Sequence, residues 1–345
     1  MTQVLEKPRT VPHFTHLKDH SPAELMGLVE LAMALKEAPP RDNPLAGQSL
    51  AFCFMNPSLR TQVSMEVATT QLGGHAVVLS LGTDTWKMEF EEGSVMDGAA
   101  AEHLKEAVPV LTRFCQSVAL RSFPSGSSWE QDKLEPYLTA FKKYSTAPVI
   151  NLESATGHPC QALADLMTIK ERMEPKGKNF LLTWAPHIKS LPMAVPASAI
   201  EIASIAGMNV TVARPEGFDL DAETMSRVQA SCDANGSKLT VTDKVPEAFD
   251  GQHVVYAKSW GSIGNYNQPL PTDPAFRAKW IVTAEKMRRT SSALFMHCLP
   301  VRRNLVVKDE VLDGPWSVVL DQAENRLHTA KAVLMTLLNH RRPSR

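Results

Sequence analysis

Cysteine is scarce in this sequence, and long apolar runs are missing. The 345 residues include five cysteines and no C-x-x-C pair, a pattern that favours reduced thiols over a disulfide framework or a zinc site. No apolar stretch approaches the roughly 18 residues that a membrane span needs, and residues 1–10 contain no apolar core of a leader. These absences predict a cytoplasmic protein that does not cross a membrane.

An excess of one charge is also missing. Lys and Arg number 36, Asp and Glu number 37, and the formal net charge is −1. The even spread gives no electrostatic footprint for nucleic acid or an anionic membrane, so we expect small-molecule partners. The sequence has no Walker loop, G-x-G-x-x-G fingerprint or cluster of metal ligands, so we expect no nucleotide, cofactor or metal. A nicotinamide dehydrogenase would need that fingerprint, which Asn56-Pro57-Ser58 replaces.

The chain is long enough for two domains, each with its own core. Strands are expected at 50–55, 75–81, 117–120, 147–151, 178–184, 208–213, 238–242, 253–257, 293–297 and 317–321. Helices are expected between the later strands and at 22–37, 59–72, 102–114, 128–143, 158–173 and 323–339. The alternation predicts an α/β fold with two doubly wound, parallel-sheet domains joined by long helices.

The segment from Leu50 to Thr61 has the composition of an anion site. An apolar strand ends at Asn56-Pro57, and Ser58 stands where the N-cap of the next helix is expected. A helix start presents unpaired N–H groups and partial positive charge, and Arg60 and Thr61 add a guanidinium and a hydroxyl there. The same Ser-x-x-Thr pattern also occurs as a plain helix cap, so the anion site is one of two interpretations.

Four motifs, in order, resemble those of the aspartate and ornithine carbamoyltransferases. They are Asn56-Pro57-Ser58-Leu59-Arg60-Thr61, His158-Pro159-Cys160-Gln161, Ser259-Trp260-Gly261 and His297-Cys298-Leu299-Pro300. The resemblance implies a carbamoyl phosphate-binding domain at 1–155, completed by the C-terminal helix 323–345, and a domain for the amine substrate at 156–322. It also implies a homotrimer with shared active sites. One departure is Gln62, where the family usually has a second arginine.

The resemblance assigns most of these motif residues to carbamoyl phosphate. The residues implied to bind it are Ser58, Leu59, Arg60, Thr61, Trp86, Arg121, His158, Gln161, Cys298, Leu299 and Arg326, with Trp86 coming from the neighbouring subunit. Thr61, Arg121 and His158 would polarise the carbonyl oxygen, and Gln161 would accept from the carbamoyl NH₂ group. Cys298, the fourth expected catalytic residue, would position the amine, because carbamoyl phosphate is already activated and needs no covalent intermediate.

The segment before Ser259 differs from ordinary ornithine carbamoyltransferases. They carry an aspartate four residues earlier, which pairs with the substrate's α-ammonium, whereas this chain has Val255 there and Lys258 beside the motif. An ammonium group would lose its partner and meet a like charge, so the resemblance points to the branch that acts on N-acylated ornithine. The acceptor-binding residues implied by that branch are Glu153, His187, Lys258, Cys298, Arg302, Ala101 and Lys189. The branch also implies a knotted proline-rich loop at 184–196.

The acyl group is predicted from the stretch 99–103. Acetyl-specific relatives carry a glutamate where Ala101 stands and succinyl-specific ones lack it, and a facing carboxylate would repel the second charge of a succinyl tail. Lys189 is either a partner for that charge or a solvated lysine. We therefore expect carbamoyl transfer to the δ-amine of N-succinyl-L-ornithine in arginine biosynthesis. N-acetyl-L-ornithine as acceptor, and a non-catalytic ligand-binding or regulatory paralogue, stay open as alternatives.

Overall fold

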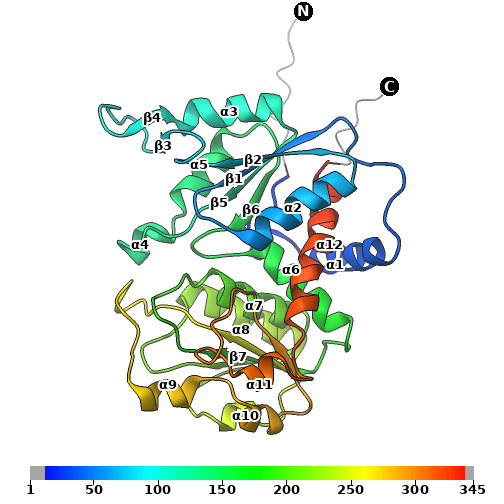
Figure 1. The fold of residues 1–345 in the computed structure, drawn as a ribbon, viewed down its shortest axis with the longest axis vertical. Coiled ribbons are helices and arrows are strands. Elements are labelled where there is room, and N and C mark those ends of the chain that lie inside the picture. Colours follow the sequence, from blue (N-terminus) through cyan, green and yellow to red (C-terminus); the bar gives the residue numbers. More distant parts are fainter. Residues whose placement is uncertain (1–11, 339–345) are drawn as a thin grey trace, which may run out of the picture.

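Two parallel β-sheets, one in each half of the chain, organise the fold (Figure 1). The computed structural model describes residues 12–338. The first sheet has the strand order β2-β1-β5-β6 and the second has β11-β10-β7-β8-β9, and the strand pairs in both are parallel. Helices pack on the sheets, so the predicted doubly wound α/β fold is confirmed.

Strand order reverses once in each sheet. The first sheet consists of β1 (Ser49–Phe54), β2 (His75–Ser80), β5 (Ser117–Arg121) and β6 (Val149–Glu153). The second consists of β7 (Asn179–Trp184), β8 (Asn209–Ala213), β9 (Leu239–Thr242), β10 (Val254–Lys258) and β11 (Leu294–Met296). The order reverses between β1 and β5 and between β7 and β10, and ligands bind at the carboxyl ends of strands at such points. A separate ribbon pairs β3 (Lys87–Glu89) with β4 (Ala100–His103).

Most helices begin and end close to the predicted residues. The helices of the first half are α1 (Pro22–Glu37), α2 (Leu59–Gln71), α3 (Leu104–Phe114), α4 (Trp129–Asp132), α5 (Pro136–Tyr144) and α6 (Pro159–Lys170). Those of the second half are α7 (Ala194–Ile205), α8 (Ala222–Asn235), α9 (Pro274–Trp280), α10 (Ala284–Arg288), α11 (Asp309–Leu312) and α12 (Val319–Leu338). No helix within residues 12–338 is long and apolar enough to cross a membrane.

The helix predicted at 128–143 is interrupted. The chain forms α4 and then α5, because Pro136 occupies the first position of α5 and has no N–H group for a continuing helix. Glu135, just before it, has a left-handed φ of 49°. The break turns the side chain of Glu135 inward, where it becomes a buried carboxylate that the helical pattern did not predict.

The strand predicted at 317–321 is wrong. Ser317 makes one isolated bridge to Phe295, and α12 begins at Val319, four residues before the predicted start of the last helix. Val319 is buried in the first turn of the helix whereas Leu320 is 76% exposed, and short apolar runs do not distinguish a helix start from a strand. The predicted end at 339–345 lies outside the described residues.

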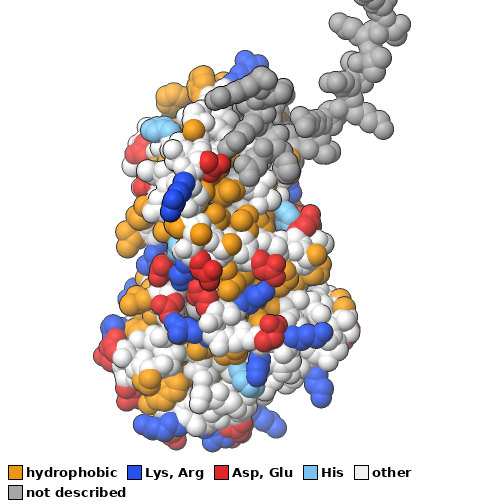
Figure 2. Space-filling model, turned by 90° about the vertical axis from the view of Figure 1, so that its right-hand side faces the viewer, with side chains coloured by type: hydrophobic (Ala, Val, Ile, Leu, Met, Phe, Trp, Pro, Cys, Tyr) orange, Lys and Arg blue, Asp and Glu red, His pale blue; other side chains and the backbone are white. Residues whose placement is uncertain are grey.

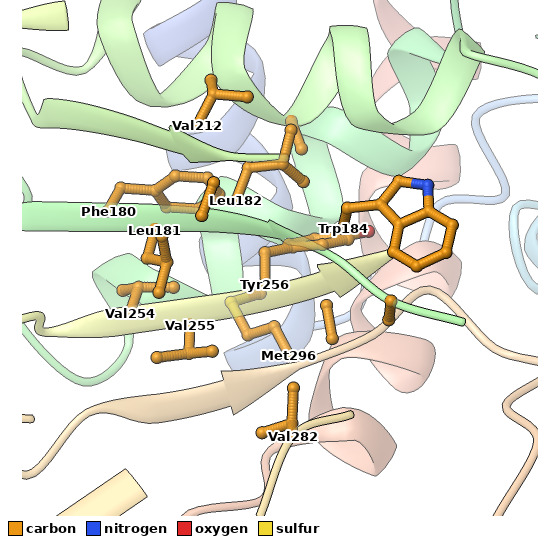
Figure 3. Close-up of a cluster of buried hydrophobic side chains, with 14 of the residues drawn as sticks. Phe180, Leu181, Leu182, Trp184, Val212, Val254, Val255, Tyr256, Val282 and Met296 are labelled. Carbon is orange, nitrogen blue, oxygen red and sulfur yellow. The ribbon is translucent and has the colours of Figure 1, made fainter. Parts of the chain in front are cut away.

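Both faces of the second sheet are buried, as the continuous apolar runs of its strands predict. Phe180, Leu182 and Tyr256 lie in this core, and Trp184 closes it at the carboxyl end of β7 (Figure 3). The indole N–H of Trp184 donates to the carbonyl of Trp260, 3.0 Å away, which ties β7 to the loop after β10.

Helix α12 joins the two halves. It starts beside the second sheet, packs against α6, and reaches α1 and α2 of the first half (Figure 1). Its residues Ala330, Val333 and Leu334 belong to the hydrophobic core below the first sheet.

The surface in Figure 2 has acidic and basic side chains interspersed, with hydrophobic side chains between them. The knot at 184–196 stays a prediction.

Candidate active site

The turn after β1 forms the expected helix start. Ser58 is the N-cap of α2, and its hydroxyl accepts from the N–H of Thr61 at 3.3 Å. Thr61 is fully buried, and its hydroxyl accepts from the guanidinium of Arg326 at 2.6 Å. The side chain of Leu59 is 72% exposed, so this residue can contribute to an anion site only through its backbone. The turn brings together hydroxyls, N–H groups and a guanidinium from the far end of the chain.

Arg121 and Glu153 end two neighbouring strands. They are register partners at the carboxyl ends of β5 and β6, and their side chains form a buried ion pair. The guanidinium of Arg121 lies 4.5 Å from the centre of the Phe123 ring. Nε2 of His158 lies 3.7 Å from the carboxylate of Glu153. The structure thus brings a predicted carbonyl donor, Arg121, together with a predicted acceptor ligand, Glu153.

His158 is a neutral imidazole at neutral pH. Burial lowers its pKa well below the usual value, and the charges of Arg326 and Arg121 lower it further. Its backbone N–H donates to the hydroxyl of Ser198 at 2.8 Å, which fixes the start of α6 against α7. Nδ1 is buried without a hydrogen-bond partner among residues 12–338. A neutral imidazole ring has one N–H group that can donate to a carbonyl oxygen, and it carries no positive charge.

The turn after β11 is held by local backbone bonds. The N–H of Leu299 donates to Nδ1 of His297 at 2.9 Å, and Leu299 has a left-handed φ of 54°. Such a backbone is uncommon for a bulky residue and occurs preferentially at functional sites. Burial raises the pKa of the Cys298 thiol, although Lys258 and Arg326 oppose it. Cys298 is therefore a thiol at neutral pH, which agrees with a positioning role and not with a thiolate nucleophile.

Cationic side chains surround His187. Its Nδ1 lies 3.0 Å from the carbonyl oxygen of Lys189, and its Nε2 accepts from Nε of Arg302 at 3.2 Å. Burial lowers the pKa of His187, and Lys258, Arg302 and Lys189 lower it further by their charge, while the bond to the Lys189 carbonyl raises it. Four predicted acceptor-binding residues are therefore close together, and their field suits a carboxylate.

Trp86 and Ala101 lie elsewhere. They are on the β3–β4 ribbon at the upper end of the molecule, apart from α6 in Figure 1. Trp86 is 56% exposed, and its indole N–H donates to the carboxylate of Glu102 at 2.7 Å. Ala101 is the extra residue of a bulge, because Lys87 pairs with Ala100 and Met88 pairs with Glu102. A single chain leaves these two predicted site residues on an exposed ribbon.

One part of the sequence argument is wrong. Val255, expected opposite the α-nitrogen of the substrate, is fully buried in the middle of β10 between Leu181 and Phe295. The carboxyl end of that strand is Lys258, which is partly exposed. The inference of an acylated α-nitrogen therefore depends on the charge of Lys258 alone.

Sequence reasoning missed two buried polar residues beside the site. Asp165 accepts from the amide of Gln161, and Gln322 accepts from the backbone N–H of His297. Asp165 follows Gln161 by four residues in a predicted helix, a spacing that places both on one face and was the available signal. Gln322 has no such local signal, because its partners are far away in the sequence.

Comparisons with known proteins identify the family of this chain. Residues 12–171 match the carbamoyl-P binding domain of aspartate/ornithine carbamoyltransferase, and residues 193–337 match the Asp/Orn binding domain of the same family. The chain belongs to the aspartate/ornithine carbamoyltransferase family. The fold and the site therefore define a carbamoyltransferase, and its relatives place it in the branch for N-acylated ornithine.

Three similar proteins represent this branch. N-acetylornithine carbamoyltransferase of Xanthomonas campestris is 40% identical over 97% of this chain and 100% of the relative. N-succinylornithine carbamoyltransferase of Bacteroides fragilis is 38% identical over 85% of this chain and 88% of the relative. The structure of an N-acetyl-L-ornithine transcarbamylase variant with one glutamate changed to alanine is 40% identical and superposes with a TM-score of 0.90. It covers 95% of this chain and 100% of its own, and binds carbamyl phosphate and N-succinyl-L-norvaline.

Proposed function

We propose that this carbamoyltransferase transfers the carbamoyl group of carbamoyl phosphate to the δ-amine of N-succinyl-L-ornithine. The products are N-succinyl-L-citrulline and phosphate. The reaction is an intermediate step of arginine biosynthesis. The proposal depends most on Ala101, the extra residue of the exposed β4 bulge, which has no carboxylate at the position where acetyl-specific relatives are expected to carry glutamate. The branch itself, with its two acyl groups, is given by the relatives.

The phosphate is held at the start of α2. Ser58, Arg60 and Thr61 provide hydroxyls, a guanidinium and N–H groups there, and Arg326 adds a second guanidinium from α12. Nε of Arg60 has no hydrogen-bond partner in the described part of the chain, so this donor is available to an anion. Positive charge at this point stabilises the phosphate dianion as it leaves with the electron pair of the broken C–O bond.

The carbonyl group lies between α6 and the ends of β5 and β6. Arg121 and neutral His158 donate to its oxygen, and Gln161 accepts from its NH₂ group. The unprotonated δ-amine attacks the carbonyl carbon, a C–N bond forms as the C–O bond to phosphate breaks, and the amine proton passes to the departing phosphate, which leaves as HPO₄²⁻. Donors aimed at the developing oxyanion are worth about 10²–10³ in rate, so Arg121→Met should lose at least that factor in kcat.

The acceptor lies over the second sheet. Lys258, Arg302 and His187 bind its carboxylate, and Glu153 contacts the acceptor from the carboxyl end of β6. Lys189, two residues after His187 in the sequence, is the proposed partner of the succinyl carboxylate. N-acetyl-L-ornithine is the second candidate, and it is favoured by the slightly higher identity and wider coverage of the acetyl-type relatives.

Specificity tests separate these candidates. We expect kcat/KM to be higher for N-succinyl-L-ornithine than for N-acetyl-L-ornithine, and lowest for free L-ornithine. Ala101→Glu should reduce the succinyl preference by about tenfold or more, since 1.4 kcal/mol of repulsion is tenfold in kcat/KM. Ala99→Glu, which adds a carboxylate two residues away on the same exposed stretch, is the matched control.

A citrulline-type colorimetric assay provides the readout for all three acceptors. A parent enzyme that prefers the acetyl compound, or an Ala101→Glu variant with unchanged preference, would refute the acyl assignment while leaving carbamoyl transfer intact. If no carbamoylated product forms from any of the three acceptors, the result would favour the non-catalytic alternative.

A second subunit completes the site in this proposal. Trp86 and Ala101 lie on the exposed β3–β4 ribbon and reach the bound substrates of a neighbouring chain in a homotrimer. The bond from Trp86 to Glu102 holds the indole in place on the ribbon. The ribbon would then supply both an aromatic contact for carbamoyl phosphate and the residue that selects the acyl group.

A further inference from the structure

Asp165 joins two of the site's motifs through one carboxylate oxygen. It lies on α6, one turn after Gln161, and is 1% exposed. Its Oδ1 accepts from Nε2 of Gln161 at 2.8 Å and from Nε2 of Gln322 at 2.6 Å. The other end of the Gln322 amide accepts from the backbone N–H of His297 at 2.9 Å. A continuous chain of bonds therefore runs from Gln161 to the turn that carries Cys298.

An ionised carboxylate fixes the direction of both amides. It can only accept, so each glutamine must turn its NH₂ group toward Asp165 and its oxygen away. For Gln322 that oxygen receives the N–H of His297. For Gln161 the oxygen is buried and has no hydrogen-bond partner within residues 12–338. An unpaired buried acceptor costs about 1–3 kcal/mol, a cost that a donor on the substrate removes.

We infer that Asp165 is a positioning residue for carbamoyl transfer, which holds the amide of Gln161 with its oxygen toward the carbamoyl NH₂ group. Through Gln322, the same oxygen fixes the backbone of His297 and so the turn before Cys298. The inference rests on the proposed role of Gln161. If the amide of Gln161 were free to rotate by 180°, half of its orientations would present NH₂ to NH₂, which repel each other.

The environment of Asp165 makes this device sensitive to pH. Burial raises the pKa of Asp165 to about 6, while the bonds from Gln161 and Gln322 and the charge of Arg326 lower it. The groups that face it from other elements are Tyr256 of β10, Arg326 of α12 and Cys298. Above about pH 6 the carboxylate is ionised and accepts from both amides. Protonation below that pH weakens its hold on Gln161.

A double-mutant cycle at Asp165 and Gln161 tests the inference. Asp165→Asn should lower kcat/KM for carbamoyl phosphate by tenfold or more at pH 8 and remove an acid limb near pH 6 from its pH profile. In the Gln161→Ala background the same change should cost less than about threefold, because its target is gone. Thr168→Val, which removes another buried hydrogen bond between α6 and α12, is the control and should keep both kcat/KM and the acid limb.

The outcomes separate this inference from the proposed function. Full additivity of the two substitutions, or an unchanged acid limb in Asp165→Asn, would overturn the positioning role. An unaffected Gln161→Ala enzyme would instead remove the proposed role of Gln161. If Asp165→Asn does not fold, Gln322→Leu carries the test, since it removes the amide that joins Asp165 to His297 and leaves the bond from Gln161 to Asp165 in place. We expect it to raise KM for the acceptor at least threefold, and an unchanged KM would contradict the link.

Discussion

Burial controls the protonation of His158, His297 and Cys298 more than neighbouring charges do. It lowers the pKa of His158 and of His297 well below the usual value and raises the pKa of Cys298. At neutral pH the site therefore contains two neutral imidazoles and a thiol beside several permanent cations. The permanent cations therefore provide the positive charge that attracts the anionic substrates. The two imidazoles act as neutral hydrogen-bonding groups.

His16 shows the opposite balance. Burial alone would lower its pKa, but its bonds to Asp19 and Glu135 outweigh burial and raise the pKa to about 9. Nε2 of His16 lies 2.8 Å from one carboxylate oxygen of Glu135, and the other oxygen accepts from the N–H of Thr156 at 2.9 Å. Thr156 stands two residues before His158, so this ion pair supports the turn that leads to the active site.

Stability should fall at alkaline pH because of His16. Its folded-state pKa is raised, so its contribution is complete below about pH 6.5 and is lost as pH rises through about 9. The loss is at most about 3 kcal/mol, at 1.36 kcal/mol per pKa unit. Urea unfolding of the parent and of His16→Gln between pH 6 and 10 measures it: the difference in unfolding free energy should shrink as pH rises. The exposed His75→Gln is the control, and a constant difference for His16→Gln would contradict the prediction.

Among the elements, helix α4 belongs to the first half of the chain in sequence but packs against the second half. Trp129 is part of the hydrophobic core of the second sheet, and its indole N–H donates to Asp221, the N-cap of α8. Asp132 accepts from the hydroxyl of Tyr266 at 2.8 Å and from the N–H groups of Ser125 and Gly126. This short helix connects the loop after β5 to the loop after β10 beside a cavity of about 170 Å³.

Removing that connection should loosen the two halves. Tyr266→Phe leaves Asp132 with its backbone donors and should lower the free energy of unfolding by about 1 kcal/mol. Trp129→Ala should cost more, about 3–5 kcal/mol, because it also opens a cavity in the second core. Urea denaturation gives both values. Tyr144→Phe, which loses an exposed bond to Glu92, should change stability least, and an equal loss in both tyrosine variants would argue against a special role for Tyr266.

Elements with strong local signals could be predicted from the sequence, and elements defined by distant partners could not. The helix cap at Ser58 is where the sequence places it, because it depends on a residue three positions away. The strand expected at 317–321 failed since a short apolar run fits either a strand or a buried helix start. The prediction of one helix at 128–143 failed because it overlooked Pro136, which lacks an N–H group for a continuing helix and begins α5 instead.

At the scale of the whole molecule, the fold class and the order of the motifs were predictable, and the pairing of distant residues was not. Arg326 and Thr61 are bonded across 265 residues, and Asp165 and Gln322 across 157. No spacing rule connects such positions without an assumed fold. The residues of the acceptor cluster at His187 were expected from the resemblance. The distances between their side chains could be obtained only from the structure.

Shared sites between subunits would give a further whole-molecule result. Trp86→Ala chains and Arg121→Ala chains, each inactive alone, should regain up to about a quarter of parent activity when refolded together, since that share of sites pairs two intact halves. Mixing Arg121→Ala with Arg60→Ala is the control, because both residues lie in the same chain's half-site and no mixture restores it. Mixed trimers that stay inactive would exclude the trans role of Trp86.

The return of α12 to the first half also has a consequence during synthesis. The four strands of the first sheet have all been made by Glu153, yet the helix that covers α1 and α2 and brings Arg326 to Thr61 is made only after the whole second sheet. At about 5–20 residues per second, that delay is roughly 10–35 s. During this time the nascent chain exposes the apolar surface that α12 later covers, and such a surface is prone to aggregation.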